Sequence, residues 1–234
     1  MPSDRDDSHH AILGVGFKLA SVFCLASMAA CVKYVGASVP PGEVVFFRGL
    51  ISMIVVVLVA WNTVGLAALK TRNLRAHAYR SLAGTFSMFC WFVSLTLIPL
   101  AQMTAISFTI PLFLTVLAML FLNERIHAYR WTALGIGFGG VLVVVAPDLL
   151  SGEGSAFGIG IAFLAAILAA FALMFLRRMS GQEHAMAITF YFFLTSTVVA
   201  LLSLIVAPWP MPTAEQLVVL GLVGLFGAAG QLTM

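Results

Sequence analysis

The chain has 234 residues, of which 62% are hydrophobic and only 9% are charged. A soluble domain carries about 25% charged residues, so lipid rather than water must surround most of this chain. The net charge of +3 includes no basic run of the kind that binds nucleic acid, which excludes a nucleic-acid partner.

Eight apolar stretches follow one another along the chain, each near the length of about 20 residues that a helix needs to cross a bilayer. Pro and Gly cluster between them, as at Pro40–Gly42 and Pro208–Pro210. The pattern predicts an all-α polytopic membrane protein. The predicted spans are residues 11–32, 42–61, 81–98, 101–122, 130–147, 157–176, 185–206 and 215–234.

The basic residues of the predicted loops all fall on one side of this arrangement. The other side has the loops 34–41, 99–100, 148–156 and 207–214, which contain no Lys or Arg. Because basic loops stay in the cytoplasm, we predict that the tail 1–10 and the C-terminus are cytoplasmic. We expect the protein in the plasma membrane, typically a bacterial inner membrane. The basic residues are Arg5, Lys70, Arg72, Arg75, Arg80, Arg125, Arg130, Arg177 and Arg178.

The sequence also repeats weakly, in an order that keeps the order of the helices. The sixth, seventh and eighth spans mirror the first, second and third. Five helices separate the copies, so the second copy enters the membrane upside down, which is an architecture of secondary transporters. We predict a first repeat at 11–147 and an incomplete second repeat at 157–234. The matches include Gly14 with Gly158, Lys33 with Arg177, and Leu82, Gly84 and Phe86 with Leu222, Gly224 and Phe226.

Three motifs make the sequence resemble the drug/metabolite transporter superfamily, in particular its EamA-type members. The resemblance implies ten helices in two five-helix repeats and transport of small metabolites by alternating access. The chain departs from that pattern because its residues supply eight spans, so we expect a truncated second repeat. The motif wording is most similar to members that import S-adenosylmethionine. The motifs are Pro-Gly-Glu-Val-Val-Phe-Phe-Arg at 41–48, Ser-Phe-Thr-Ile-Pro-Leu-Phe at 107–113, and Leu-Asn-Glu-Arg at 122–125, which is followed by Gly135 and by Gly-Gly-Val at 139–141.

Arg48 is the candidate of greatest interest for the substrate path. It lies about six residues, or about 9 Å, inside the outer end of span 42–61. A charge at that depth is a functional candidate, although snorkelling or bonding to carbonyls is a structural alternative. Glu43 points about 140° away on the same helix. A partner for Arg48 must therefore come from another helix or from the substrate.

The remaining candidates form stripes of small and polar residues, which suit either a solute path or close helix packing. Trp91 and Gln231 are equivalent in the two repeats, since 231 minus 140 is 91. We therefore expect both near the centre of the path, where an aromatic face and an amide suit a flat or cationic solute. The candidate path residues are Arg48, Ser87, Trp91, Ser94, Gln102, Thr109 and Gln231.

The function predicted from the sequence is a secondary transporter of a small organic metabolite, with the lipid bilayer and a small-molecule substrate as its partners. No catalytic motif or metal-ligand cluster is present, so we expect no enzyme activity and no cofactor or metal. The alternative is a non-transporting membrane protein or an inactive remnant of a transporter. A homodimer is one assembly compatible with the sequence. The sequence does not identify the substrate, the coupling ion or the direction of transport.

Overall fold

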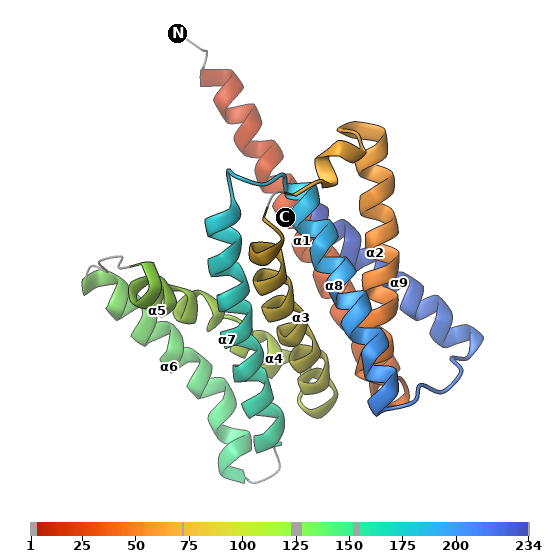
Figure 1. The fold of residues 1–234 in the computed structure, drawn as a ribbon. Coiled ribbons are helices and arrows are strands. Elements are labelled where there is room, and N and C mark those ends of the chain that lie inside the picture. The colour runs from red at the N-terminus through yellow and green to blue at the C-terminus, as the bar shows by residue number, and fades with distance from the viewer. Residues whose placement is uncertain (1–3, 72, 123–127, 152–154, 234) are drawn as a thin grey trace.

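A computed structural model describes residues 4–71, 73–122, 128–151 and 155–233, and these form a bundle of helices (Figure 1). The prediction of an all-α protein is confirmed in this part of the chain. Two short 3-10 helices, η1 (Gly36–Ser38) and η2 (Leu66–Leu69), lie between longer elements. The α-helices are α1 (Asp4–Val35), α2 (Pro41–Thr63), α3 (Leu74–Leu97), α4 (Leu100–Ser107), α5 (Ile110–Leu122), α6 (Ala128–Ser151), α7 (Ala156–Met179), α8 (Ala185–Val206) and α9 (Ala214–Leu232).

Each predicted span is mainly helical in its described residues, and six of the eight are long and apolar enough to cross a membrane. The other two are α3, which carries more polar side chains, and α6, whose apolar stretch Trp131–Pro147 is short. These two helices still run alongside the others in the bundle (Figure 1).

The helix α3 begins earlier than the sequence predicts. Asn73 caps its N-terminus by accepting a hydrogen bond of 3.2 Å from the backbone N–H of Ala76. Asparagine is a favoured residue at this position because its side chain satisfies a free N–H of the first turn. The prediction that Arg80 lies in a cytoplasmic loop is therefore wrong. Arg80 lies inside α3, and only 7% of its surface is exposed.

The predicted span 101–122 is not one continuous helix. Phe108 and Thr109 separate α4 from α5, and their N–H groups bond to Ala105 and Ile106, three residues earlier. Pro111 has no N–H to donate to the carbonyl four residues before it, and its ring crowds that carbonyl. The helix therefore tightens into a turn, and the ordinary pattern resumes where Phe113 donates to Thr109.

The helices pack in pairs, and the predicted repeat maps these pairs onto one another. The closest pairings are α1 with α9, α3 with α7, and α2 with α8. If α1, α2 and α3 correspond to α7, α8 and α9, the first two pairings exchange and the third maps onto itself. The pairing of α2 with α9 likewise corresponds to that of α8 with α3. An exchange of this kind fits two copies of one helix order that are related by a pseudo-two-fold axis.

Small residues let the paired helices approach closely, as is common between membrane helices. A Cβ atom at Gly224 of α9 would lie 2.6 Å from Ile51 of α2, so only glycine fits there. Serine hydroxyls hold the same interfaces together. The bonds between helices run from Ser21 to the carbonyl of Gly230, from Ser52 to Gly224, from Ser87 to Ala165 and from Ser94 to Gly158, at 2.7 to 3.0 Å.

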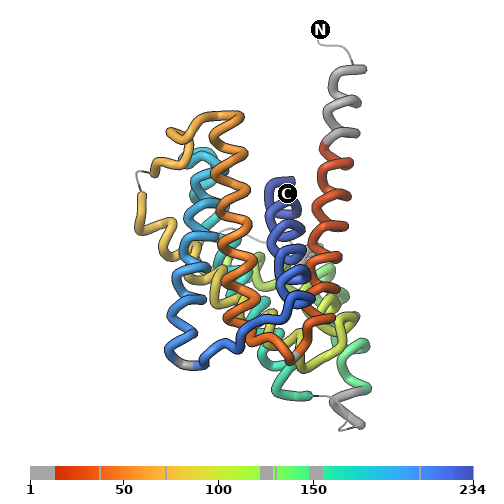
Figure 2. Tube along the Cα trace, turned by 90° about the vertical axis from the view of Figure 1, so that its right-hand side faces the viewer, coloured from red at the N-terminus to blue at the C-terminus, as the bar shows by residue number. Residues whose placement is uncertain are grey.

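The bundle has two distinct ends (Figures 1 and 2). One end carries the start of α1, the end of α9 and the connections 64–71 and 180–184. The opposite end carries the turns 36–40, 98–99 and 207–213. We call these the first end and the second end. The connections named here alternate between the ends as the sequence predicts, while residues 123–127 and 152–154 of two other predicted loops lie outside the described residues.

Candidate functional site

A cavity of about 680 Å³ lies inside the bundle, and α3 and α7 each supply more of its wall than any other helix. Helices α1, α2, α4, α5, α8 and α9 each add one to a few side chains. The cavity extends from Trp91 and Met103 in the middle of the bundle to Ser180 and Glu183, in the connection between α7 and α8. It therefore reaches the first end of the bundle.

The break between α4 and α5 borders this cavity. Ser107, the last residue of α4, and Ile110, the first residue of α5, both line it. Interrupted helices border the substrate sites of many transporters, because an unwound segment frees backbone groups only where they face a cavity. The Pro111 motif therefore gives the cavity an interrupted helix, which the sequence did not predict.

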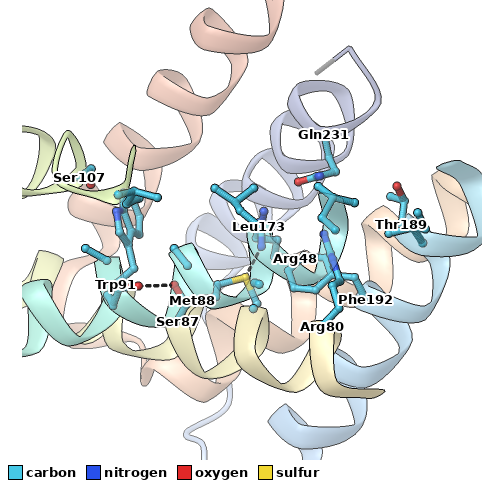
Figure 3. A pocket seen from close by; sticks show the side chains of 18 of the residues that line it. Arg48, Arg80, Ser87, Met88, Trp91, Ser107, Leu173, Thr189, Phe192 and Gln231 are labelled. Carbon is cyan, nitrogen blue, oxygen red and sulfur yellow. Dashed lines mark hydrogen bonds between the residues drawn. The ribbon is translucent and has the colours of Figure 1, made fainter. Parts of the chain in front are cut away.

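Four of the seven predicted path residues line the cavity: Arg48, Ser87, Trp91 and Gln231. Figure 3 shows them on α2, α3 and α9, with Trp91 at one side of the cavity and Gln231 on the other side of Arg48. The Ser87 hydroxyl donates to the carbonyl of Ala165, so this group also holds α3 to α7. Their role in a substrate path stays a prediction.

The other three predicted residues do not line the cavity. Ser94 donates to the carbonyl of Gly158 and joins α3 to α7. Thr109 is fully buried, and its hydroxyl donates to the carbonyl of Ile106 at 2.6 Å within the break. Gln102 is 5% exposed and lies in α4. All three side chains are buried outside the cavity wall, since a polar stripe on one helix face serves packing as readily as a path.

Arg48 is 6% exposed and contacts sulfur and aromatic atoms. Its Nε donates to the Met28 sulfur at 3.2 Å, and its Nη1 donates to the Met88 sulfur. The guanidinium also lies 5.7 Å from the centre of the Phe193 ring. Opposite it, Gly227 of α9 leaves the room that Arg48 occupies, since a Cβ there would lie 3.0 Å from Nε. Arg48 thus has only weak acceptors among the described residues.

Arg80 is a second buried arginine in the cavity wall, and the sequence analysis placed it in a loop. Its guanidinium stacks over Phe192 with 4.4 Å between its carbon and the ring centre. Its Nε and Nη1 are buried and find no hydrogen-bond partner among the described residues. A signal was present in the sequence. Arg80 lies four residues before Gly84, so it extends the stripe of Gly84, Ser87 and Trp91 by one turn.

Most of the remaining wall is apolar, with aromatic and thioether side chains near its middle. Trp91 contacts Phe92 edge to face, with 5.3 Å between the ring centres. Met28, Met88 and Met103 add flexible, polarizable surface. A wall of this kind suits a flat or irregular organic solute better than a bare inorganic ion.

At the first end, a pair of side chains that the sequence analysis left without a role lies beside the cavity. His77 of α3 is 1% exposed, and its Nε2 lies 3.4 Å from the Glu183 Oε2. Thr71 donates to the other oxygen of Glu183 at 3.0 Å. The His77 ring also packs against Tyr191, with 4.7 Å between the ring centres. These contacts hold the α7–α8 connection against α3 and α8.

At the second end, polar contacts tie the helices together beyond the cavity. The Lys33 ammonium donates to the carbonyls of Leu95 and Ile98 at 2.7 and 2.9 Å, at the C-terminus of α3. A cation is favoured there because the last carbonyls of a helix are free and the helix dipole is negative. Tyr34 donates to Glu215 at 2.7 Å, which joins α1 to α9.

The described residues contain no group of three or more His, Cys, Asp or Glu side chains that would hold a metal ion. The three cysteines are free and half-buried, in α1 and α3. The cavity therefore offers cationic, aromatic and hydroxyl groups to a solute rather than metal ligands.

Comparison with known proteins assigns the chain. Residues 12–146 match the model of the EamA-like transporter family. The chain belongs to this family. The transporter is 32% identical to an S-adenosylmethionine uptake transporter of Rickettsia conorii, over 93% of this chain and 72% of that protein. It is 31% identical to a pseudopaline exporter of Pseudomonas aeruginosa, over 92% of this chain and 75% of that protein.

A more distant relative is a riboflavin transporter of Rhizobium johnstonii, which is 28% identical over 71% of this chain and 54% of that protein. All three relatives are named as transporters of small organic molecules. The resemblance to EamA-type transporters found in the sequence is therefore confirmed. The chain is a membrane transporter of small molecules, and the alternative of a non-transporting protein is not favoured.

Proposed function

We propose that this transporter moves a small organic metabolite through the cavity by alternating access, with the first end of the bundle in the cytoplasm. The observation that carries the proposal is the cavity of about 680 Å³, with its buried arginines and interrupted helix, inside an otherwise apolar bundle. Such a volume lies in the range of small-molecule sites.

The contacts at the two ends support an inward-facing state. Beyond the cavity, Lys33 and Tyr34 tie α1 to α3 and α9 at the second end. Toward the first end, the cavity wall includes Lys18 and Glu183. Alternating access requires that one side be closed while the other is open. We infer that the second-end contacts form the closed outer side, and that they separate when the transporter turns outward.

The orientation rests on the distribution of charge. Lys70, Arg75, Arg177 and Arg178 lie at the first end, while the turns of the second end contain no Lys or Arg. By the positive-inside rule the first end is cytoplasmic, together with the N-terminal tail. We also propose that residues 11–147 and 157–234 are the two inverted repeats, which the exchange of helix pairings supports.

We propose S-adenosylmethionine as the first substrate to test, because relatives at 30–33% identity are named as its uptake transporters. The aromatic and thioether wall around Trp91 and Met88 suits a flat ring. Riboflavin, named in a more distant relative, is the second candidate.

The test is uptake of labelled S-adenosylmethionine into proteoliposomes that contain the purified chain. We expect saturable uptake above that of protein-free liposomes, and competition by excess unlabelled substrate. Equal uptake in protein-free liposomes contradicts S-adenosylmethionine as the substrate. The same experiment with riboflavin then tests the second candidate.

A further inference from the structure

Two positive charges share the cavity wall without a carboxylate between them. Arg48 and Arg80 come from α2 and α3, and both are buried side chains of the same cavity wall. Figure 3 shows both side chains in the part of the cavity between Met88 and Phe192. Two buried cations in an apolar bundle are unfavourable unless a negative charge joins them.

The acidic residues of the described chain do not fill that role. Glu183 is the one carboxylate in the cavity wall among the described residues, and it contacts His77 and Thr71. No ion pair links a described carboxylate to Arg48 or Arg80.

The structure holds the two guanidinium groups in place by contacts that leave hydrogen-bond donors unused. Arg80 stacks its flat face on Phe192, and Nε and Nη1 have no partner among the described residues. Arg48 donates to thioether sulfurs, which are weak acceptors that an oxygen anion readily replaces. A side chain held by packing, with free donors, is prepared for a ligand.

We infer that Arg48 and Arg80 form a subsite for the carboxylate of the transported metabolite. This inference rests on the proposed function, in that the cavity is the substrate path. Guanidinium groups bind carboxylates through paired N–H bonds, and such charge-assisted bonds are strong where water is excluded. Trp91, Phe92 and the methionines then receive the organic body of the same molecule. Lys18 adds a third positive charge to the wall.

The geometry favours a carboxylate over a bare phosphate. An inorganic anion would leave the aromatic and thioether wall uncovered, whereas an organic acid uses both parts of the cavity. The subsite also refines the expectation of a cationic solute. A cationic group near Trp91 is compatible with the cavity only in a molecule that brings a carboxylate to the arginines.

The test compares two probes of nearly the same shape, the anion indole-3-acetate and the neutral amide indole-3-acetamide, by calorimetric titration of the purified chain. We expect the acid to bind about 10-fold tighter or more, the ratio that one charge-assisted bond supplies. Arg48→Gln and Arg80→Gln should each lose most of this preference, and the Lys variants should keep part of it. Arg75 is an exposed arginine on α3, the helix that carries Arg80. Arg75→Gln is therefore the matched control and should keep the full preference for the acid.

Thermal unfolding of each variant separates loss of the fold from loss of the subsite. Equal binding of acid and amide by the unaltered chain, or binding of neither, overturns the carboxylate subsite. So does an acid preference that survives in folded Gln variants. Displacement of indole-3-acetate by inorganic phosphate at lower concentrations than by acetate also overturns it. If the acid preference holds but S-adenosylmethionine is not taken up, the subsite stands and that substrate fails.

Discussion

Lys33 offers the sharpest test of the closed second end. In Lys33→Met the two hydrogen bonds to the carbonyls of Leu95 and Ile98 are lost, while most of the apolar stem is kept. A buried charge-assisted bond contributes about 1.5–3 kcal/mol. Lys33 is exposed, so we discount both bonds for solvent and take about 1.4 kcal/mol in total. That is about a tenfold shift toward the outward-open state.

The assay is labelling of a cysteine at Ser107, which lines the cavity, in a chain whose own three cysteines are replaced by alanine. A membrane-impermeant maleimide is added from the side of the second end. We expect Lys33→Met to raise the labelling rate about tenfold. Lys70→Met, an exposed lysine at the first end, is the control and should not raise it. An unchanged labelling rate in a folded Lys33→Met chain refutes the proposal that the Lys33 bonds hold the second end closed.

Three further predictions concern packing, the cavity centre and the first end. Gly158→Val should destabilise the chain by about 1–3 kcal/mol in thermal or denaturant unfolding, because a Cβ there would lie 2.8 Å from side-chain atoms of Leu97 and Ile98. Gly160→Val meets open space and should not destabilise the chain. Trp91→Phe should keep substrate affinity while Trp91→Ala and Gln231→Ala weaken it, and unchanged affinity in all three places the site elsewhere. Glu183→Gln should loosen the α7–α8 connection and speed its amide hydrogen exchange, and unchanged exchange contradicts a tie between this connection and α3.

The helices could be predicted from the sequence because lipid imposes a simple rule of length and apolarity. The span predicted at 185–206 has the same bounds as α8. The rule failed at two places where local chemistry decides. Arg80 extended the polar stripe of α3 beyond the apolar stretch, and its burial depends on Phe192 of α8. Pro111 interrupted span 101–122 although the whole stretch is apolar.

The candidate site could be predicted only in part, because burial between helices is a property of their packing. Arg48 and Trp91 stood out as a charge and an indole within apolar spans, and both line the cavity. Ser94 and Thr109 looked the same as Ser87 in the sequence, yet only Ser87 lines the cavity, while Ser94 bonds to Gly158 of α7 and Thr109 bonds to Ile106 within the break. Ser87 and Ser94 both bond to α7, so what separates them is their position along α3 relative to the cavity.

The central claim is that the metabolite passes through this cavity, and blocking the cavity tests it most directly. Ala169 of α7 lines the cavity, whereas Leu164 on the same helix is 48% exposed on the outer surface of the bundle. The measurement is counterflow of labelled S-adenosylmethionine in proteoliposomes made with Ala169→Trp, Leu164→Trp or the unaltered chain. We predict counterflow in the unaltered chain and in Leu164→Trp, and its loss in folded Ala169→Trp. Counterflow that persists undiminished in Ala169→Trp contradicts the account.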